Sequence, residues 1–252
     1  MITKEFHVTS GSQFGKRITI LAAEKERVGK AVVNRILWRN TTPSNPILIT
    51  DGSSGSFVFC HYLQRCVENS DDSLRVWTNN TDVSLQASCH PGASPNHISV
   101  HCAPGRFSAK YCGTFGNDAR QWIEEHCSKC TCILSVTALD VDLGPCGRGE
   151  DAKDIKAAVL RMAKQLIIVA DYEKLRQPRD ADHAAAPDLW LKWRDEHSKS
   201  GRLFVVTTKS QGLKDGRFPV QGGVDNKRSP DEIEAENHAR FRIALGDQYM
   251  VV

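Results

Sequence analysis

The chain has 252 residues, of which 40% are hydrophobic and 25% charged, as expected for a globular protein with one large or two small domains. A formal net charge of +3 gives no electrostatic reason to expect a nucleic-acid partner. No apolar run approaches the roughly 18–20 residues that a membrane span requires, and residues 1–17 lack the apolar core of a signal peptide. We therefore expect a cytoplasmic protein that does not associate with membranes.

The N-terminal quarter of the chain predicts a helix, then a strand, a turn and a second helix. Apolar residues at helical spacing predict the first helix over residues 22–38. A short apolar run, Ile47 to Ile49, predicts a strand that ends near Asp51. Five small residues, Gly52 to Ser56, are predicted as a turn, and a helix is predicted over residues 57–67.

The Gly/Ser turn has the chemistry of an anion-binding site. A strand, a turn and a helix in succession direct free backbone N–H groups and the positive end of a helix dipole at one spot. The hydroxyls of Ser53, Ser54 and Ser56 add donors, and Gly52 and Gly55 let the backbone approach a ligand closely. The turn therefore predicts phosphate or carboxylate binding. The alternative is an ordinary strand-to-helix turn in which a serine caps the helix.

The rest of the chain continues the alternation of strands and helices. Further strands are predicted at residues 74–78, 97–103, 132–138, 166–171 and 203–207, and further helices at residues 82–88, 117–126, 155–163, 188–197 and 230–245. Asn117 or Asp118 is the expected N-cap of its helix. Residues 139–149 and 176–188 are predicted as loops, and residues 249–252 as an edge strand or a subunit contact. Near-continuous hydrophobic strands separated by helices predict an α/β fold, a mostly parallel sheet with helices on both faces.

Ligands of such sheets bind beyond the carboxyl ends of the strands. The polar residues predicted to lie there are Asp51 with the Gly/Ser turn, Thr78, Asn79, the segment Pro104 to Arg106, the segment Thr137 to Asp140, and Asp171. Several polar strand ends indicate one site more strongly than any single strand end. The alternative is that these positions carry ordinary turn residues.

Nine cysteines without a signal peptide argue against a disulfide framework, because the number is odd. Cys127 and Cys130 have the CxxC spacing of zinc ligands. However, Cys132 begins an apolar run, where a small buried residue is the simpler interpretation, and no second CxxC completes a four-ligand site. We expect no metal and no cofactor.

Short motifs in a fixed order extend from Glu24 to about Thr208. They are Glu24-Lys25, Asp51-Gly52-Ser53-Ser54, Val76-Trp77-Thr78-Asn79, Pro104-Gly105-Arg106, Phe115-Gly116-Asn117, a strand ending near Asp140, the helix from Asp151 to Lys156, and the run from Val169 through Asp171 to Lys174. In this order they resemble the C-terminal effector-sensing domain of DeoR-type sugar-catabolism repressors. That domain belongs to the fold group of ribose-5-phosphate isomerase, glucosamine-6-phosphate deaminase and CoA transferases.

The resemblance implies a sugar-phosphate site. The phosphate is expected on the Gly/Ser turn, while Lys156, Asp171 and Lys174 bind sugar hydroxyls and anionic oxygens. The chain departs from the family pattern at Thr50, which aligns with the family's loop aspartate, so that Asp51 comes one place later. Only about 20 residues precede the Glu-Lys helix, too few for the family's helix-turn-helix, and we expect no direct DNA binding.

The domain boundaries follow from where the resemblance ends. Residues 1–20 are predicted to form an N-terminal arm and residues 21–210 the sensor domain, with an insert near residues 176–200. Residues 211–252 are predicted to form a C-terminal extension. Because such domains commonly self-associate, a homo-oligomer is the expected state.

Three hypotheses for the function follow. The first is a binding module that senses a phosphorylated sugar without a DNA-binding module of its own. The second is an aldose–ketose isomerase of the same fold group, in which Asp140, Glu150 or Asp171 is the base and Lys156 or Lys174 the stabilising cation. The third is an interaction module that docks a partner through Trp190, Trp193 and the C-terminal helix. We expect binding rather than catalysis.

Overall fold

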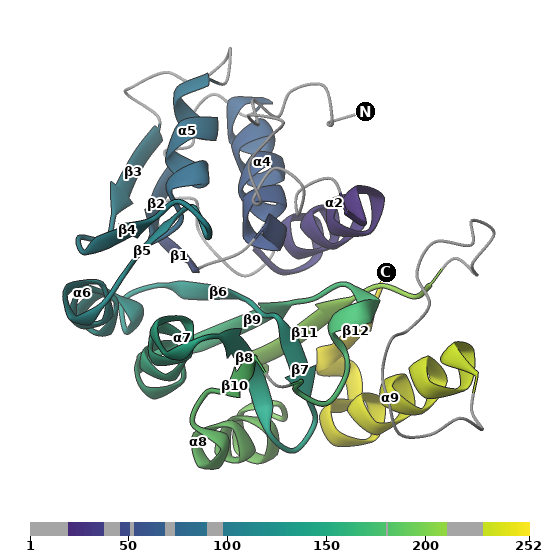
Figure 1. The fold of residues 1–252 in the computed structure, drawn as a ribbon. Coiled ribbons are helices and arrows are strands. Elements are labelled where there is room, and N and C mark those ends of the chain that lie inside the picture. Colours follow the sequence, from purple (N-terminus) through teal and green to yellow (C-terminus); the bar gives the residue numbers. More distant parts are fainter. Residues whose placement is uncertain are drawn as a thin grey trace.

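A computed structural model describes residues 20–37, 46–50, 53–68, 74–89, 98–179, 181–210 and 229–252 (Figure 1). Asp51 and Gly52 of the predicted anion-binding turn lie outside these residues.

The main sheet has seven parallel strands in the order β12-β11-β9-β6-β1-β2-β3. The strands are β1 (Ile47–Thr50), β2 (Leu74–Thr78), β3 (Ile98–Cys102), β6 (Thr131–Ser135), β9 (Gln165–Val169), β11 (Leu203–Thr207) and β12 (Tyr249–Val251). The predicted α/β fold with a parallel sheet is therefore confirmed. The last residues of the chain pair with β11 as an edge strand, one of the two predicted alternatives.

Helices cover both faces of this sheet (Figure 1). One face carries α2 (Ala22–Ala31), the π-helical turn η2 (Val32–Leu37), α4 (Ser53–Glu68) and α5 (Thr81–Cys89). The other carries α6 (Asn117–Cys127), α7 (Glu150–Met162), α8 (Pro187–Lys192), the π-helical turn η4 (Trp193–His197) and α9 (Pro230–Leu245). Each face has its own hydrophobic core, because successive strand side chains point to opposite faces: Ile47 and Ile49 enter one core and Leu48 the other.

Two small antiparallel sheets lie beside the main sheet. β4 (Arg106–Ser108) and β5 (Gly113–Phe115) form a hairpin. β7 (Ala138–Asp140), β8 (Gly144–Arg148) and β10 (Asp182–Ala184) form a sheet in the order β10-β8-β7. The short helical turns η3 (Tyr172–Lys174) and η5 (Gly246–Gln248) complete the elements.

Four local predictions were wrong. Residues 139–149 and 176–188, predicted as loops, contain β8 and β10, because tertiary pairing overrides their Gly, Pro and polar composition. The helix predicted from residue 57 begins at Ser53. The N-cap of α6 is Gly116 at φ 96° rather than Asn117 or Asp118, and no side chain caps it.

Candidate functional site

The candidate site lies where the strand order of the sheet reverses. The chain builds β1, β2 and β3 outward in one direction, and β6 then returns to the free side of β1. At such a switch point the connections after the two neighbouring strands leave the sheet on opposite faces and open a crevice between them. Thr50 ends β1, Ser135 ends β6, and α4 begins three residues after Thr50.

The first turn of α4 packs against the end of β6. The backbone N–H of Gly55 donates to Ser135 Oγ at 3.0 Å. Gly55 is required here, because a Cβ atom would lie 2.8 Å from Ile49 Cγ2. This close approach explains why a Gly/Ser-rich segment is helical: contact with the sheet outweighs the low helix propensity of glycine. The described part of the predicted turn, residues 53–56, is thus the positive end of α4.

Lys174 joins this helix start to the end of β9. Its Nζ donates to Ser54 Oγ at 3.2 Å and lies 3.0 Å from Asp171 Oδ2. The Asp171 side chain is 4% exposed and that of Lys174 20%. Ser54, Asp171 and Lys174, three of the predicted site residues, therefore meet at one place.

A second network lies beside the first, at the end of β2. Thr78 Oγ1 donates to the carbonyl of Ile49 at 2.7 Å, and Asn80 Nδ2 donates to Ser56 Oγ at 3.2 Å. Asn79 Nδ2 donates to the Thr114 carbonyl at 3.1 Å. These side chains are buried, and their hydrogen bonds hold β1, β2 and α4 together at the carboxyl edge of the sheet.

Asp82 is a buried carboxylate in this second network that the sequence analysis did not single out. Its backbone N–H donates to Asn80 Oδ1 at 3.0 Å, and burial raises the pKa of its carboxyl group. The sequence signal was weak, because an acidic residue in the first turn of a helix is ordinary.

Asp140 and Arg106 make their contacts elsewhere. Asp140 Oδ1 accepts the backbone N–H groups of Asp142 and Leu143, each at 2.9 Å, and so closes the turn between β7 and β8. Arg106 forms an exposed ion pair with Asp151 at the start of α7.

Lys156, which is 0% exposed, lies on α7 near the thiol of Cys146. Burial raises the pKa of Cys146 to about 11, helped by the carboxylates of Asp182 and Asp140 and opposed by Arg176 and Lys156. The thiol is therefore protonated at neutral pH. Lys156 and Asp140 thus share a buried polar region under the small β10-β8-β7 sheet.

Arg176 and Asp182 extend this region, and the sequence analysis did not identify either residue. Their side chains lie 2.9 Å apart, and Asp182 Oδ1 accepts the hydroxyl of Thr137 at 2.9 Å. Burial alone would raise the pKa of Asp182, but hydrogen bonds from the Arg179 backbone, Thr137 and Arg176 lower it below its ordinary value. Asp182 is therefore held as a carboxylate.

The cysteine cluster is part of the core. Cys127, Cys130 and Cys132 are buried, and the sulfur atoms of Cys130 and Cys132 lie 4.0 Å apart. Hydrogen bonds with Cys127 and Cys130, together with burial, raise the pKa of Cys132 well above its ordinary value. In the described part of the chain, no group of three or more His, Cys, Asp or Glu side chains is arranged to hold a metal ion.

Among the described residues, no helix combines the length and the apolar character needed to cross a bilayer.

Comparison with solved structures finds several similar folds. One is ribose 5-phosphate isomerase from Plasmodium falciparum, with 14% identity and a TM-score of 0.36 over 61% of this chain and 52% of that one. A second is ribose 5-phosphate isomerase A from Methanocaldococcus jannaschii, with 10% identity and a TM-score of 0.39 over 60% and 52%. A third is eIF2B delta from Chaetomium thermophilum, with 9% identity and a TM-score of 0.40 over 61% and 49%. The chain thus spans about half the length of each.

No curated protein sequence matches the chain significantly. The model of one protein family, the DeoR C terminal sensor domain, matches residues 21–189. This match covers more than half of the chain, including β1, β6, β9 and the contacts of Lys174. The protein therefore belongs to the family of DeoR C-terminal sensor domains, which are ligand-sensing regulatory domains.

Proposed function

We propose that this domain senses a phosphorylated sugar, which binds at the carboxyl ends of β1, β6 and β9 with its phosphate against the first turn of α4. The observation that carries the proposal is the position of Lys174. Its Nζ lies between Ser54 Oγ at the start of α4 and the carboxylate of Asp171.

The charge balance of this arrangement favours an anion. The N-terminus of a helix carries roughly half a positive charge, and Lys174 adds a full one beside it. Asp171 supplies one negative charge, so the cluster stays positive without a ligand. A phosphate group would accept hydrogen bonds from the Ser54 hydroxyl and the Lys174 ammonium group, and charge-assisted bonds of this kind are among the strongest in proteins.

The rest of the predicted site would contact the sugar. Asp171 is a hydrogen-bond acceptor for sugar hydroxyls. Asp51, Gly52, Ser53, Ser56, Thr78, Asn79, Arg106, Asp140 and Lys156 remain proposed contacts of the ligand or of its phosphate.

A thermal-shift screen tests the proposal. The panel contains sugar phosphates, the same sugars without phosphate, and inorganic phosphate. At a ligand concentration a hundredfold above Kd, the expected stabilisation is about 2.7 kcal/mol, which corresponds to a rise in Tm of roughly 5–10 °C for a domain of this size. The proposal fails if no phosphorylated sugar raises the Tm of the folded protein.

The variant Lys174→Gln tests the placement of the phosphate. Losing one charge-assisted hydrogen bond costs about 1.5–3 kcal/mol, so we expect Kd to rise about 10- to 150-fold in isothermal titration calorimetry. Lys129→Gln is the matched control, because Lys129 is exposed and precedes β6, and so lies at the amino ends of the strands, away from the proposed site. Equal affinities of the two variants would place the phosphate elsewhere.

A second candidate function is the aldose–ketose isomerase. It is favoured by the Asp171–Lys174 pair, which places a carboxylate base 3.0 Å from a cation. Incubation with ribose 5-phosphate, with ketose formation followed over time, distinguishes the two functions. Turnover that Asp171→Asn abolishes while binding persists would make the protein an enzyme.

The location of the protein in the cell and its oligomeric state can be proposed as well. A sensor of phosphorylated metabolites works where they are made, so we propose a cytoplasmic location, which cell fractionation tests. We also propose a homo-oligomer, which sedimentation velocity would reveal as a species heavier than the 28.0 kDa chain.

A further inference from the structure

The C-terminal helix α9 makes a direct contact with the turn that carries Lys174. Asn237 Nδ2 donates to the backbone carbonyl of Leu175 at 2.7 Å. Leu175 is buried and follows Lys174 in the chain. The contact therefore falls one residue from the side chain that reaches Ser54, although α9 lies outside the residues matched by the family model.

Several other contacts also hold the Lys174 turn: Leu175 is buried in the core and forms a bridge with Leu139 of β7, and the Arg176 side chain pairs with Asp182. Lys174 N donates to the Asp171 carbonyl at 3.0 Å and Leu175 N to the Tyr172 carbonyl at 3.1 Å, both within the turn. Outside it, Arg176 N donates to the Leu139 carbonyl at 3.1 Å, and Tyr172 N donates to Thr208 Oγ1 at 3.3 Å. To these contacts the bond from Asn237 adds a connection to α9 at the residue next to Lys174.

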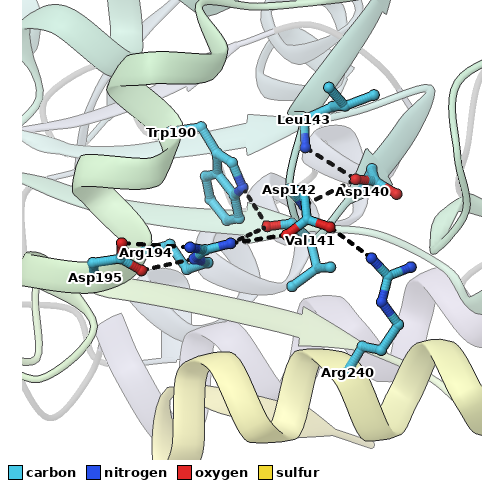
Figure 2. Close-up of polar contacts among 8 residues, drawn as sticks. All are labelled: Asp140, Val141, Asp142, Leu143, Trp190, Arg194, Asp195 and Arg240. Carbon is cyan, nitrogen blue, oxygen red and sulfur yellow. Dashed lines mark hydrogen bonds and ion pairs between the residues drawn. The ribbon is translucent and has the colours of Figure 1, made fainter.

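Asn237 itself stands on a firmly anchored helix. Ser229 and Glu232 form a capping box at the start of α9, and Phe241 and Leu245 are buried in the core. Arg240 lies 2.7 Å from Asp142, and Arg194 also reaches this carboxylate from η4; Figure 2 shows both contacts. After Asn237 the helix is therefore held to the core and to Asp142.

We propose that Asn237 is a positioning residue of the effector site, which holds the Leu175 carbonyl so that Lys174 Nζ stays at the start of α4. The ligand in this proposal rests on the proposed function, whereas the contact between Asn237 and Leu175 does not depend on it. The proposal also makes α9 part of the sensor. Because coupling between two events is reciprocal, a ligand that orders the Lys174 turn also strengthens the docking of α9.

The first experiment needs no ligand. Hydrogen exchange is measured at the amides of Lys174, Leu175 and Arg176 in the wild type, Asn237→Ala and Asn237→Asp. The aspartate keeps the shape of the side chain but cannot donate, so its carboxylate would face the Leu175 carbonyl. We expect exchange at these amides to speed up at least about tenfold in both variants. Unchanged exchange would overturn the proposal.

The control for general loosening of α9 is Arg240→Gln, which removes a different polar contact of the same helix. Its effect on exchange at Lys174, Leu175 and Arg176 should be less than about twofold. An acceleration equal to that of Asn237→Ala would show that these amides report the docking of α9 in general, and the specific role of Asn237 would be rejected.

The second experiment measures binding of inorganic phosphate, and then of the sugar phosphate that the screen selects, by calorimetry. We expect Kd to rise about 5- to 50-fold in Asn237→Ala and Asn237→Asp and to change less than twofold in Arg240→Gln. If the wild type and both Asn237 variants bind equally, Asn237 does not position Lys174, while the sensing function stands. If the wild type binds no phosphate compound, the sensing function fails, and hydrogen exchange alone decides the role of Asn237.

Discussion

His61 is a buried histidine on α4 that faces α2. It is 7% exposed, and in the described part of the chain its Nε2 has no hydrogen-bond partner. Burial lowers its pKa to about 4, with a further contribution from Lys30 that Glu26 partly offsets. The imidazole is therefore neutral in the folded protein at neutral pH.

The stability of the fold should depend on pH through His61. The unfolded chain takes up this proton near pH 6.5, whereas the folded protein takes it up only near pH 4. Between these values the unfolded state binds more protons, so stability is lost as the pH falls, by up to about 1.4 kcal/mol per pH unit.

Urea unfolding at pH 7, 5.5 and 4.5 checks this expectation in the wild type and in His61→Gln, which does not titrate at this position. The comparison is needed because other groups titrate as well; Asp82, whose pKa is raised, acts in the opposite direction. As the pH falls, the wild type should lose more free energy of unfolding than His61→Gln does. A constant difference would contradict the assignment.

Single residues differ in how well the sequence predicts their role. Ser54 and Asp171 could be found because each follows an apolar strand, where chain order places it at the ligand edge, whereas Lys174 was implied only by the resemblance to the DeoR-type domain. Ser135 could not, although it accepts the Gly55 N–H, because the strand was predicted to continue to residue 138, which placed Ser135 inside it rather than at its end. Asn237 is harder still, since its contact depends on where a distant helix docks.

At the scale of elements, the segment from Asp140 to Gly144 shows how an irregular connection is held. The indole Nε1 of Trp190 donates to the Val141 carbonyl at 2.9 Å, and Trp190 is 0% exposed. Gly144 has φ +83°, and a Cβ atom there would lie 2.4 Å from Trp190 Cγ. Figure 2 shows that Arg194 reaches Asp142 from the side of Trp190 and that Arg240 reaches it from the opposite side.

These contacts should differ in energy. Trp190→Phe removes a buried donor and part of a buried ring, so we expect a loss of about 1–3 kcal/mol in the free energy of unfolding. Arg240→Gln removes an ion pair whose side chains are 36% and 61% exposed, and exposed pairs contribute about 0–1 kcal/mol. Urea denaturation of the two variants provides the measurement. A larger loss for Arg240→Gln would mean that the ion pair, and not the indole, anchors this segment.

The regular elements were predictable, and the small sheet was not. Apolar runs identify β1, β9 and β11 because a strand buried on both faces is hydrophobic throughout. β8 is a central strand that contains Pro145 and two glycines, residues that normally argue against a central strand. The glycines occur here because of close packing: a Cβ atom on Gly147 would lie 2.8 Å from the backbone carbon of Ala152.

At the scale of the whole molecule, the two ends of the described chain are integrated into the fold by different cores. α2 packs on α4 at close range, since a Cβ atom on Gly29 would lie 2.9 Å from the Phe57 carbonyl oxygen. At the other end, Tyr249 of β12 stacks on Phe241 of α9 with ring centroids 5.6 Å apart. The last strand thus contributes both to the sheet and to the core beneath it.

Tyr249→Ala should therefore destabilise the entire domain. Truncating a buried aromatic side chain costs about 3–5 kcal/mol, which lowers Tm by roughly 6–20 °C at this size. Differential scanning calorimetry provides the measurement. Ile243→Ala on the neighbouring helix is the control, because Ile243 is 86% exposed and its loss should change stability by no more than about 0.5 kcal/mol. Equal Tm values for the two variants would mean that β12 is not part of the cooperative fold.

The strand order also has a consequence for synthesis on the ribosome. β1 emerges first and lies in the interior of the sheet, and β2 and β3 add to one side of it in the order in which they are translated. β6 must then return to the other side of β1, across the roughly 80 residues that separate the two strands in the chain. After that, β9, β11 and β12 each add to an edge already present. Closing a long chain segment is the entropically costly step. Folding of the nascent chain should therefore stop at the three strands β1, β2 and β3 until β6 has left the exit tunnel.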